Sequence, residues 1–304
     1  MKHFKDKVAV ITGGGSGIGK ALALAAAKRG MQLALLDIQS DALAQCVDEL
    51  RQTGVNVMGI TADVSDSSAM QTVADQIEKR YGAIHLVFNN AGVTSSGPVW
   101  ESTEKDWDWL LGINLKGVIN GVRSFTPKML AAAAADNSYE GCMVNTASLA
   151  GILAGPGMGI YSVSKHAVMA LSECLHYDLQ LVSPQVKAAA LCPSYVPTAI
   201  GNSDRNRPKH LLNEKPPTKA QMASLAAAQQ AVAQGNITAQ EVAEITFAAV
   251  EDGSFYIFPS PEPLALFKLR SDNILNQVTP EFPYDLFPAL KDRRDRMLAA
   301  QAQA

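Results

Sequence analysis

A tyrosine and a lysine four positions apart, Tyr161 and Lys165, are the residues best placed to do chemistry in this sequence. On a helix, side chains at i and i+4 share one face. A phenol with a pKa of about 10 is a poor base at neutral pH, and a neighbouring ammonium favours the phenolate. The pair could therefore take a proton from a substrate hydroxyl. The same spacing also occurs on ordinary solvated helix faces, so it needs support from elsewhere.

Ser148 provides the first support, because it follows an apolar run that predicts a strand at 142–146. In open α/β sheets, ligands bind at the carboxyl ends of the strands. A serine hydroxyl at that edge could hydrogen-bond the oxygen of a substrate. Ser148, Tyr161 and Lys165 together therefore indicate proton transfer at an alcohol or a carbonyl.

A glycine-rich turn, T-G-G-G-S-G-I-G from Thr12 to Gly19, is the second feature with chemical potential. Its spacing is G-x-x-x-G-x-G on Gly13, Gly17 and Gly19 rather than G-x-G-x-x-G. Glycines permit positive φ angles and let a pyrophosphate approach the backbone, while a helix N-terminus offers free N–H groups. A merely tight loop is the alternative. The position after the first expected strand favours dinucleotide binding.

Asp37 ends the second expected strand and follows Gly19 by 18 positions. A carboxylate there can accept hydrogen bonds from the ribose hydroxyls of adenosine and would repel a 2′-phosphate. Ser16, in the glycine turn, supplies no positive charge for such a phosphate. NAD is therefore favoured over NADP. The alternative for Asp37 is that it ends the strand and caps the next turn.

Short β-branched or apolar runs alternate with longer helical patterns along most of the chain. Strands are predicted at 7–12, 32–37, 55–61, 84–89, 142–146, 186–192 and 255–258, and helices at 17–29, 41–53, 66–81, 104–135, 158–181 and from a Thr238–Glu241 capping box to Gly253. This alternation predicts an α/β fold, with right-handed crossovers and a doubly wound parallel sheet that is buried on both faces.

Composition narrows the class of protein further. The 304 residues are 47% hydrophobic and 18% charged, which is typical of a globular chain, and the net charge of −3 argues against a nucleic-acid partner. The four cysteines are widely spaced and predict neither a disulfide framework nor a metal site. The N-terminus has too few apolar residues for a signal peptide, and no segment is typical of a membrane helix, so we expect a cytoplasmic protein.

As a set, these motifs resemble those of the short-chain dehydrogenase/reductase family, in its compact, non-extended type, over about residues 5–258. The resemblance implies a Rossmann-type sheet of seven strands in the order 3-2-1-4-5-6-7 with helices on both faces. It also implies a catalytic tetrad of Asn114, Ser148, Tyr161 and Lys165. In that tetrad Tyr161 is the general base, Lys165 lowers its pKa and holds the nicotinamide ribose, and Asn114 holds a water that relays protons.

The resemblance further implies a set of cofactor contacts. Asp63-Val64 is similar to the pair that contacts adenine, Asn89 to Gly92 is similar to the family's NNAG, and Pro193 to Thr198 is similar to the segment beside the nicotinamide. The implied cofactor-binding residues are Gly13, Ser16, Gly17, Ile18, Gly19, Asp37, Asp63, Val64, Asn90, Ala91, Gly92, Tyr161, Lys165, Pro193, Val196 and Thr198. Ser194 stands where the family has glycine, and with Tyr195 it would narrow the pocket.

We therefore expect an NAD-dependent oxidoreductase that interconverts a secondary alcohol and a ketone. The stretches WDWLLGINLKGVINGV and VEDGSFYIFPSPE resemble a branch that includes bacterial dehydrogenases of aryl-ether benzylic alcohols, which implies a hydrophobic or aromatic substrate. One alternative is a dinucleotide-binding regulator or scaffold without turnover, against which the complete tetrad counts. Another is an NADPH-dependent biosynthetic ketoreductase, against which Asp37 counts.

Two segments lie outside the alternating pattern. Residues 199–235, which we call the lid, follow the position of Thr198 and include a predicted helix at 219–234 with an apolar stripe of Met222, Leu225, Ala226 and Val232. The stripe could face a hydrophobic substrate or pack on the body of the protein. Residues 259–304 form a C-terminal extension, and we place the whole chain, 1–304, in a single domain. The resemblance implies a homodimer or homotetramer paired through the long helices with Asn114 and Lys165.

Overall fold

The computed structural model describes residues 1–261, 264–280, 291 and 295. Its contacts divide the chain into two compact units, Met1–Ser260 and Pro261–Ala304, and each is considered by itself. The second unit contains α9, Leu264–Leu275. Most of the predicted C-terminal extension beyond residue 280 lies outside the described residues. The functional residues expected from the sequence all belong to the first unit.

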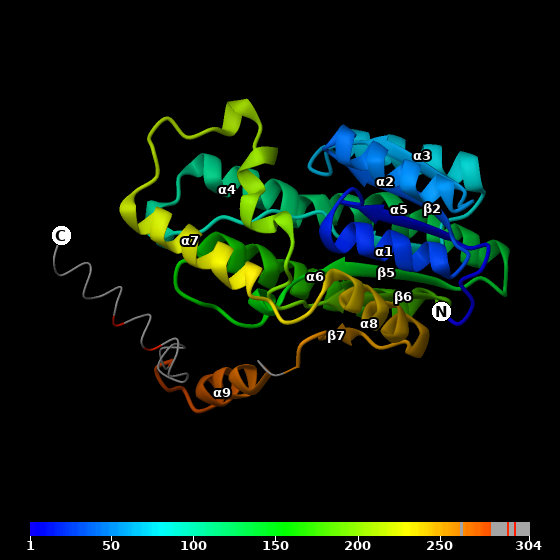
Figure 1. The fold of residues 1–304 in the computed structure, drawn as a ribbon. Helices are drawn as coiled ribbons and strands as arrows, with labels where there is room; N and C mark the ends of the chain where they lie inside the picture. Colours follow the sequence, from blue (N-terminus) through cyan, green and yellow to red (C-terminus); the bar gives the residue numbers. More distant parts are fainter. Residues whose placement is uncertain (262–263, 281–290, 292–294, 296–304) are drawn as a thin grey trace. The chain divides into compact units, whose positions relative to one another are not determined.

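A parallel sheet of seven strands forms the centre of the first unit, in the order β3-β2-β1-β4-β5-β6-β7 (Figure 1). The strands are β1 Val8–Thr12, β2 Gln32–Asp37, β3 Val57–Thr61, β4 Leu86–Asn89, β5 Gly141–Thr146, β6 Val186–Leu191 and β7 Tyr256–Ile257. The order reverses between β1 and β4, which is the switch point where such sheets bind ligands. The predicted fold class and strand order are confirmed.

Helices cover both faces of the sheet and bury two separate apolar clusters. On one face lie α1 Gly17–Lys28, α2 Ser40–Gln52 and α8 Ala239–Asp252. On the other lie α3 Ser67–Tyr81, α5 Gly117–Ala135 and α6 Gly159–Val182. The central strands β1, β4 and β5 are buried along their whole length, as expected for a sheet covered on both sides.

The predicted helix at 104–135 is the clearest departure from the sequence-based expectation. The structure divides it into α4 Glu104–Leu111, a π-helical segment Gly112–Lys116 and α5. A π-helical turn is wider than an α-helical one and is frequent at functional sites. Here it contains Asn114.

The lid has little regular structure before its final helix. It contains two short 3₁₀ segments, Ala199–Asn206 and Lys209–Leu211, and α7 Lys219–Ala233, which begins with a capping box at Thr218. The lid lies next to α4 and the loop before it, at the left of Figure 1, and hydrogen bonds join the two.

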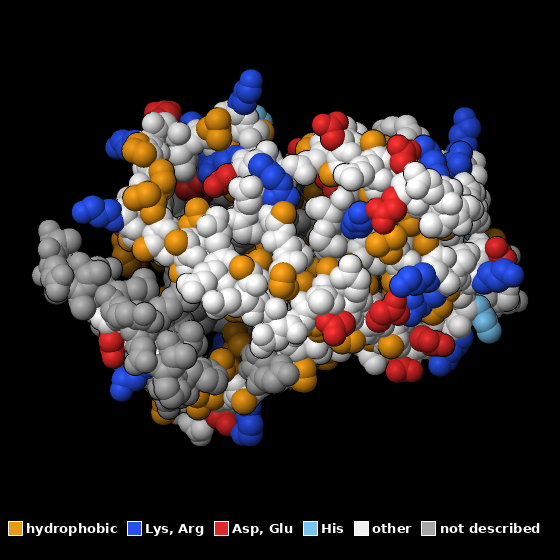
Figure 2. Space-filling model, viewed as in Figure 1, with side chains coloured by type: hydrophobic (Ala, Val, Ile, Leu, Met, Phe, Trp, Pro, Cys, Tyr) orange, Lys and Arg blue, Asp and Glu red, His pale blue; other side chains and the backbone are white. Residues whose placement is uncertain are grey.

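The four residues of the predicted apolar stripe of α7 do not all pack against the body of the protein. Met222 is 51% exposed and Ala226 is exposed, whereas Leu225 and Val232 are half-buried. Positive and negative side chains are interspersed over the face shown in Figure 2. Within the described ranges, no helix combines the length and apolar character needed to cross a membrane.

Candidate active site

The glycine turn joins β1 to α1 at the switch point of the sheet. Gly13 and Gly17 have φ angles of +66° and +53°, which residues other than glycine rarely adopt. A Cβ on Gly19 would lie 2.0 Å from the carbonyl oxygen of Gly13. The first turn of α1 carries no acidic residue, and the side chain of Ser16 does not cap it. The helix N-terminus is therefore open to an anion such as a pyrophosphate.

Asp37 supports this turn directly. One carboxylate oxygen accepts a hydrogen bond from the N–H of Gly15 (2.9 Å) and the other accepts one from the N–H of Gln39 (3.0 Å). Asp37 therefore caps the chain after β2, which was the alternative considered from the sequence. An ionised carboxylate has about four lone-pair sites, so two bonds leave capacity for ribose hydroxyls. Capping and ribose binding are compatible.

Thr12 links the glycine turn to the NNAG segment. Its hydroxyl accepts hydrogen bonds from the N–H groups of Asn90 (2.9 Å) and Ala91 (3.0 Å), and the Asn90 amide donates to its carbonyl (3.1 Å). A Cβ on Gly13 would lie 3.0 Å from Cα of Ala91. The sequence motif marks Thr12 only as the start of the turn, whereas the structure shows that it joins β1 to the end of β4.

Asp63 and Val64 lie just past the end of β3, next to the strand that ends in Asp37. The Asp63 carboxylate is exposed and accepts hydrogen bonds from the N–H (2.8 Å) and hydroxyl (2.7 Å) of Ser65. Val64 is buried, and its carbonyl accepts a hydrogen bond from the Asn120 amide (2.8 Å). This pair therefore has a fixed backbone at the edge where an adenine is expected. The supporting role of Asn120 is not apparent from the sequence.

Ser148, Tyr161 and Lys165 come together at the carboxyl end of β5. The Ser148 hydroxyl accepts a hydrogen bond from the N–H of Ala150 (3.1 Å) and is also hydrogen-bonded to the Tyr161 phenol. The Lys165 ammonium lies 5.8 Å from the centre of the Tyr161 ring. It donates a hydrogen bond to the carbonyl of Thr146 at the end of β5 (2.8 Å), and Lys165 is 3% exposed.

The pKa values of this group differ from the expectation. Burial raises the pKa of Tyr161, the hydrogen bond to Ser148 lowers it by less, and nearby Tyr195 raises it further. Burial lowers the pKa of Lys165 to about 8. The predicted lowering of the tyrosine pKa by Lys165 is therefore absent from the protein by itself. Removal of both groups from water penalises phenolate and ammonium alike, and this effect dominates.

Asn114 is fully buried in the π-helical segment. Its amide accepts a hydrogen bond from the N–H of Val93 (2.9 Å) and donates to the Val93 carbonyl (2.9 Å) and to the Ser164 hydroxyl (3.1 Å). A Cβ on Gly92 would lie 3.4 Å from its oxygen and 3.6 Å from the Lys165 nitrogen. Asn114 and Lys165 thus approach the same glycine of the NNAG segment from two helices.

The segment after β6 closes the site on its remaining side. The Pro193 carbonyl accepts hydrogen bonds from the N–H of Leu149 (3.0 Å) and the hydroxyl of Ser148 (3.4 Å). Val196 is buried, and the Thr198 methyl lies 3.3 Å from where a Cβ on Gly17 would stand. The segment therefore runs from Ser148 to the glycine turn, although Ser194 replaces the family's glycine within it.

One flank of Tyr161 is apolar. Residues of the loop after β4, of α4 and of α6 bury a small cluster there, joined by a lid residue. We call this cluster the apolar wall: Val93, Trp109, Leu110 and Ile160, with Trp107, Ile113, Tyr161 and Leu211 packed against them. A substrate oxygen at Tyr161 would therefore lie near apolar and aromatic surface. Among the described residues, no three metal-ligating side chains come together.

Comparisons with known proteins identify the family of the chain. A family model described as short chain dehydrogenase matches residues 7–209. The CLA biosynthesis dehydrogenase/reductase of Lactiplantibacillus plantarum is 32% identical over 283 residues, which are 92% of this chain and 97% of that protein. The C alpha-dehydrogenase of a Sphingobium strain is 32% identical over 282 residues, 92% of this chain and 89% of that protein.

A solved structure is also similar over nearly the whole chain. It is a short chain dehydrogenase/reductase from Burkholderia phymatum in complex with NAD, with 45% identity and a TM-score of 0.90. The similarity covers 93% of this chain and 99% of that one. The chain that carries this glycine turn and this tyrosine–lysine pair thus has a fold similar to that of a protein with bound NAD.

Proposed function

Since the chain belongs to the short-chain dehydrogenase family and is an oxidoreductase acting on CH–OH groups with a nicotinamide dinucleotide, we propose that it oxidises hydrophobic secondary alcohols with NAD. The observation that carries this proposal is the meeting of Ser148, Tyr161 and Lys165 at the carboxyl edge of β5, beside the glycine turn. These three side chains can bind an alcohol oxygen and accept its proton.

The cofactor site is built from backbone rather than from charged side chains. In the proposed enzyme, the uncapped N-terminus of α1 holds the pyrophosphate, Asp37 the adenosine ribose, and Asp63 and Val64 the adenine. Bound there, NAD supplies the hydride acceptor. Gly92, Val196 and Thr198 would line the nicotinamide side, and Lys165, whose nitrogen lies 3.6 Å from where a Cβ on Gly92 would stand, would reach a ribose hydroxyl.

Tyr161 is the proposed general base. Its phenol is hydrogen-bonded to Ser148, so an alcohol oxygen that binds both hydroxyls would have its proton directed at the phenolate. Ser148 then stabilises the charge that develops on the substrate oxygen. Lys165 acts in its charged form on the phenolate, and its pKa of about 8 leaves a large charged fraction at neutral pH. Asn114 holds the backbone of Val93 beside this group.

The preference for NAD over NADP is proposed from Asp37. Its carboxylate lies at the end of β2, where it would repel a 2′-phosphate, and its neighbours Ile38 and Gln39 carry no positive charge. The solved relative with bound NAD is consistent with this preference.

The substrate class is proposed from the apolar wall. Trp109, Leu110 and Ile160 belong to the buried cluster against which Tyr161 packs, and Leu211 of the lid packs against the same cluster. A secondary alcohol with an aromatic or bulky aliphatic substituent would fit this surface better than a small polar one.

We also propose a homodimer or homotetramer. On the outer face of α6, Tyr177, Leu181 and Val182 are 61%, 85% and 67% exposed, which is unusual for apolar side chains on a monomer. Light scattering coupled to gel filtration tests this directly, and a monomer at micromolar concentration would contradict it.

The decisive experiment is reduction of NAD⁺, followed by absorbance, with a panel of secondary alcohols that includes aromatic and steroidal ones, and with NADP⁺ in parallel. We expect turnover with the bulky apolar alcohols and NAD⁺. Equal efficiency with NADP⁺ would contradict the Asp37 argument. Binding of NAD without turnover of any alcohol would favour a dinucleotide-binding scaffold instead.

A further inference from the structure

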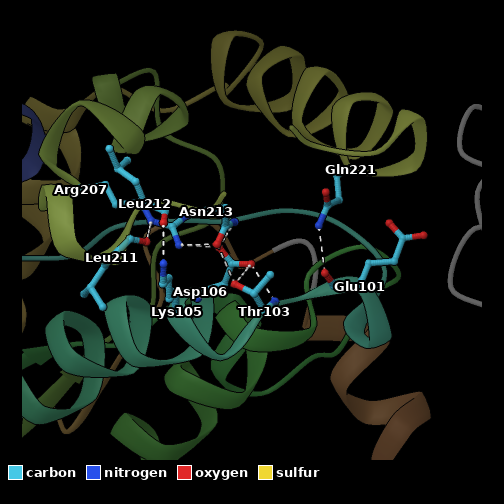
Figure 3. Close-up of polar contacts among 9 residues, drawn as sticks. All are labelled: Glu101, Thr103, Lys105, Asp106, Arg207, Leu211, Leu212, Asn213 and Gln221. Atoms are coloured by element: carbon cyan, nitrogen blue, oxygen red, sulfur yellow. Dashed lines mark hydrogen bonds and ion pairs between the residues drawn. The ribbon is translucent and has the colours of Figure 1, made fainter. Parts of the chain in front are cut away.

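A buried ion pair joins the lid to the start of α4. The Arg207 guanidinium lies 2.7 Å from the Asp106 carboxylate, with side chains that are 8% and 11% exposed. Figure 3 shows Arg207 and Asn213 of the lid directed at Asp106 and Thr103. Asn213 donates a hydrogen bond to Asp106 (2.9 Å), and Thr103 donates to it through its N–H (2.8 Å).

Arg207 is the residue through which these contacts reach the apolar wall. Its guanidinium also donates a hydrogen bond to the carbonyl of Leu211 (2.8 Å) and lies over the ring of Trp109, 5.0 Å from its centre. Leu211 in turn packs against the wall, as Tyr161 does. One side chain thus contacts α4, the backbone of Leu211 and the largest residue of the wall.

Burial of a charge is unfavourable unless its partners are complete, and a well-packed apolar pair often gives equal stability. What an arginine adds is a rigid fork that can hold two acceptors at once. Here the two acceptors, the Asp106 carboxylate and the Leu211 carbonyl, belong to α4 and to the lid. The geometry therefore fixes the position of Leu211 relative to α4.

The part of the lid on the cofactor side is held by contacts that do not involve Arg207. Asn206 accepts a hydrogen bond from the Gln39 side chain (2.6 Å), close to Asp37. Ser203 accepts one from the N–H of Thr94 (3.0 Å). These two bonds anchor residues 199–206 without Arg207. The end of the lid stretch has contacts of its own, because Lys105 donates a hydrogen bond to the Leu212 carbonyl (3.2 Å) and Thr103 donates one to the Asn213 side chain (2.8 Å). Loss of Arg207 would therefore release mainly residues 207–211, whose hydrogen bond from Arg207 to the Leu211 carbonyl is lost.

We propose that Arg207 is a positioning residue that holds Leu211 in the apolar wall beside Tyr161 and thereby sets the affinity for the bulky apolar group of the alcohol. This inference rests on the proposed function for its substrate and on the described contacts for its geometry. Loss of a residue that only stabilises the fold would affect the turnover of all substrates, whereas loss of a positioning residue should change KM for large substrates alone.

The test compares Arg207→Ala with Arg205→Ala. Arg205 is a matched control, since its guanidinium bonds carbonyls within the lid, those of Ala199 and Asn202. Two alcohols are used with NAD⁺, propan-2-ol and 1-(2-naphthyl)ethanol. For Arg207→Ala we expect KM for the naphthyl alcohol to rise about tenfold or more, the discrimination that an apolar contact supplies. We expect kcat, and kcat/KM for propan-2-ol, to stay within about threefold, a change too small to indicate a lost apolar contact.

Leu211→Ala provides the second arm. It should raise KM for the naphthyl alcohol as Arg207→Ala does, and the double variant should be no worse than either single one, because both remove the same contact. Equal losses for both alcohols, or additive effects in the double variant, would overturn the proposal. Arg207→Lys, which keeps the charge without the fork, should give an intermediate KM and provides a folded variant if Arg207→Ala is unstable.

A third arm requires no turnover. Lys209 lies in the stretch that Arg207 holds, and the bond after it is a trypsin site. Cleavage after Lys209, followed by mass spectrometry, should be faster in Arg207→Ala than in Arg205→Ala or the unaltered protein. An unchanged rate would contradict the positioning role even if no alcohol were oxidised, whereas inactivity of the unaltered protein with faster cleavage in the variant would count against the proposed function alone.

Discussion

The Lys165 ammonium lies 5.8 Å from the centre of the Tyr161 ring, yet its hydrogen bond goes to the backbone carbonyl of Thr146. The lysine is thus fixed to the end of β5, not to the phenol one helical turn away. Both side chains are withdrawn from water, which lowers the pKa of Lys165 to about 8 and raises that of Tyr161.

The stability of the protein without cofactor should depend on the charge of Lys165. Between its folded pKa of about 8 and its unfolded value of 10.5, the unfolded chain binds more protons, so this group makes stability rise with pH in that window. The full effect is about 3 kcal/mol. Lys165→Met removes it, so the stability of the variant relative to the unaltered protein should decline from pH 7.5 to pH 10, by several degrees in Tm.

Other groups titrate in the same range, and the comparison of the two proteins cancels them. Burial raises the pKa of Cys142 to about 12 and that of Tyr256 to about 12, and both make stability fall with pH above their unfolded values. A difference between variant and unaltered protein that does not change with pH would show that Lys165 is charged in the fold.

Tyr161→Phe should abolish proton transfer and retain the cofactor. A positioned general base contributes about 10²–10⁴-fold in rate, so kcat for alcohol oxidation should fall by at least that order. NAD binding, measured by calorimetry, should be preserved because the glycine turn is untouched. Tyr177→Phe is the matched control, since that tyrosine is 61% exposed further along the same helix. An active Tyr161→Phe enzyme would falsify the assignment.

Ser148→Ala should move the pH profile of alcohol oxidation. The Ser148 hydroxyl lowers the pKa of Tyr161, so its loss leaves the burial effect unopposed and raises that pKa further. We expect the ascending limb of kcat/KM against pH to shift to higher pH, together with a lower plateau because the substrate oxygen loses a donor. A lower plateau at an unshifted midpoint would mean that Ser148 binds substrate without acting on the tyrosine.

Asp37→Asn should reduce the preference for NAD. The asparagine oxygen can still accept the hydrogen bond from the Gly15 N–H, so the turn keeps this support, while the bond from the Gln39 N–H and the negative charge are lost. The ratio of kcat/KM for NADP⁺ to that for NAD⁺ should rise about tenfold or more, since like charges in contact cost several kcal/mol. An unchanged ratio would show that residues other than Asp37 discriminate between NAD⁺ and NADP⁺.

Gly19→Ala should prevent NAD binding by deforming the turn. The added Cβ would stand 2.0 Å from the Gly13 carbonyl oxygen and 2.7 Å from the Asn90 amide, so both the turn and the NNAG segment must shift. Gly155→Ala is the control, because no atom lies within 4 Å of a Cβ there. Calorimetric titration with NAD should show loss of binding for the first variant and normal binding for the second.

The strands and helices could be predicted from the sequence because each depends on a pattern within a few residues. Strand β2 has the predicted bounds, and α1 begins at the predicted Gly17. The helix at 104–135 was predicted wrongly as continuous, since nothing local distinguishes Gly112–Lys116 from the residues around it. The π-helical turn accompanies hydrogen bonds that buried Asn114 donates to the Val93 carbonyl and to the Ser164 hydroxyl, 21 and 50 positions away in the chain.

The sequence by itself therefore determined the fold class, the glycine turn and the residue types available for proton transfer, because periodicity and spacing carry that information locally. Tertiary structure alone decided which groups meet and how their protons are held. Arg207 and Asp106 are separated by 101 positions, and their pairing has no local signal. The pKa shifts of Tyr161 and Lys165 likewise follow from burial, which the packing of several distant elements creates.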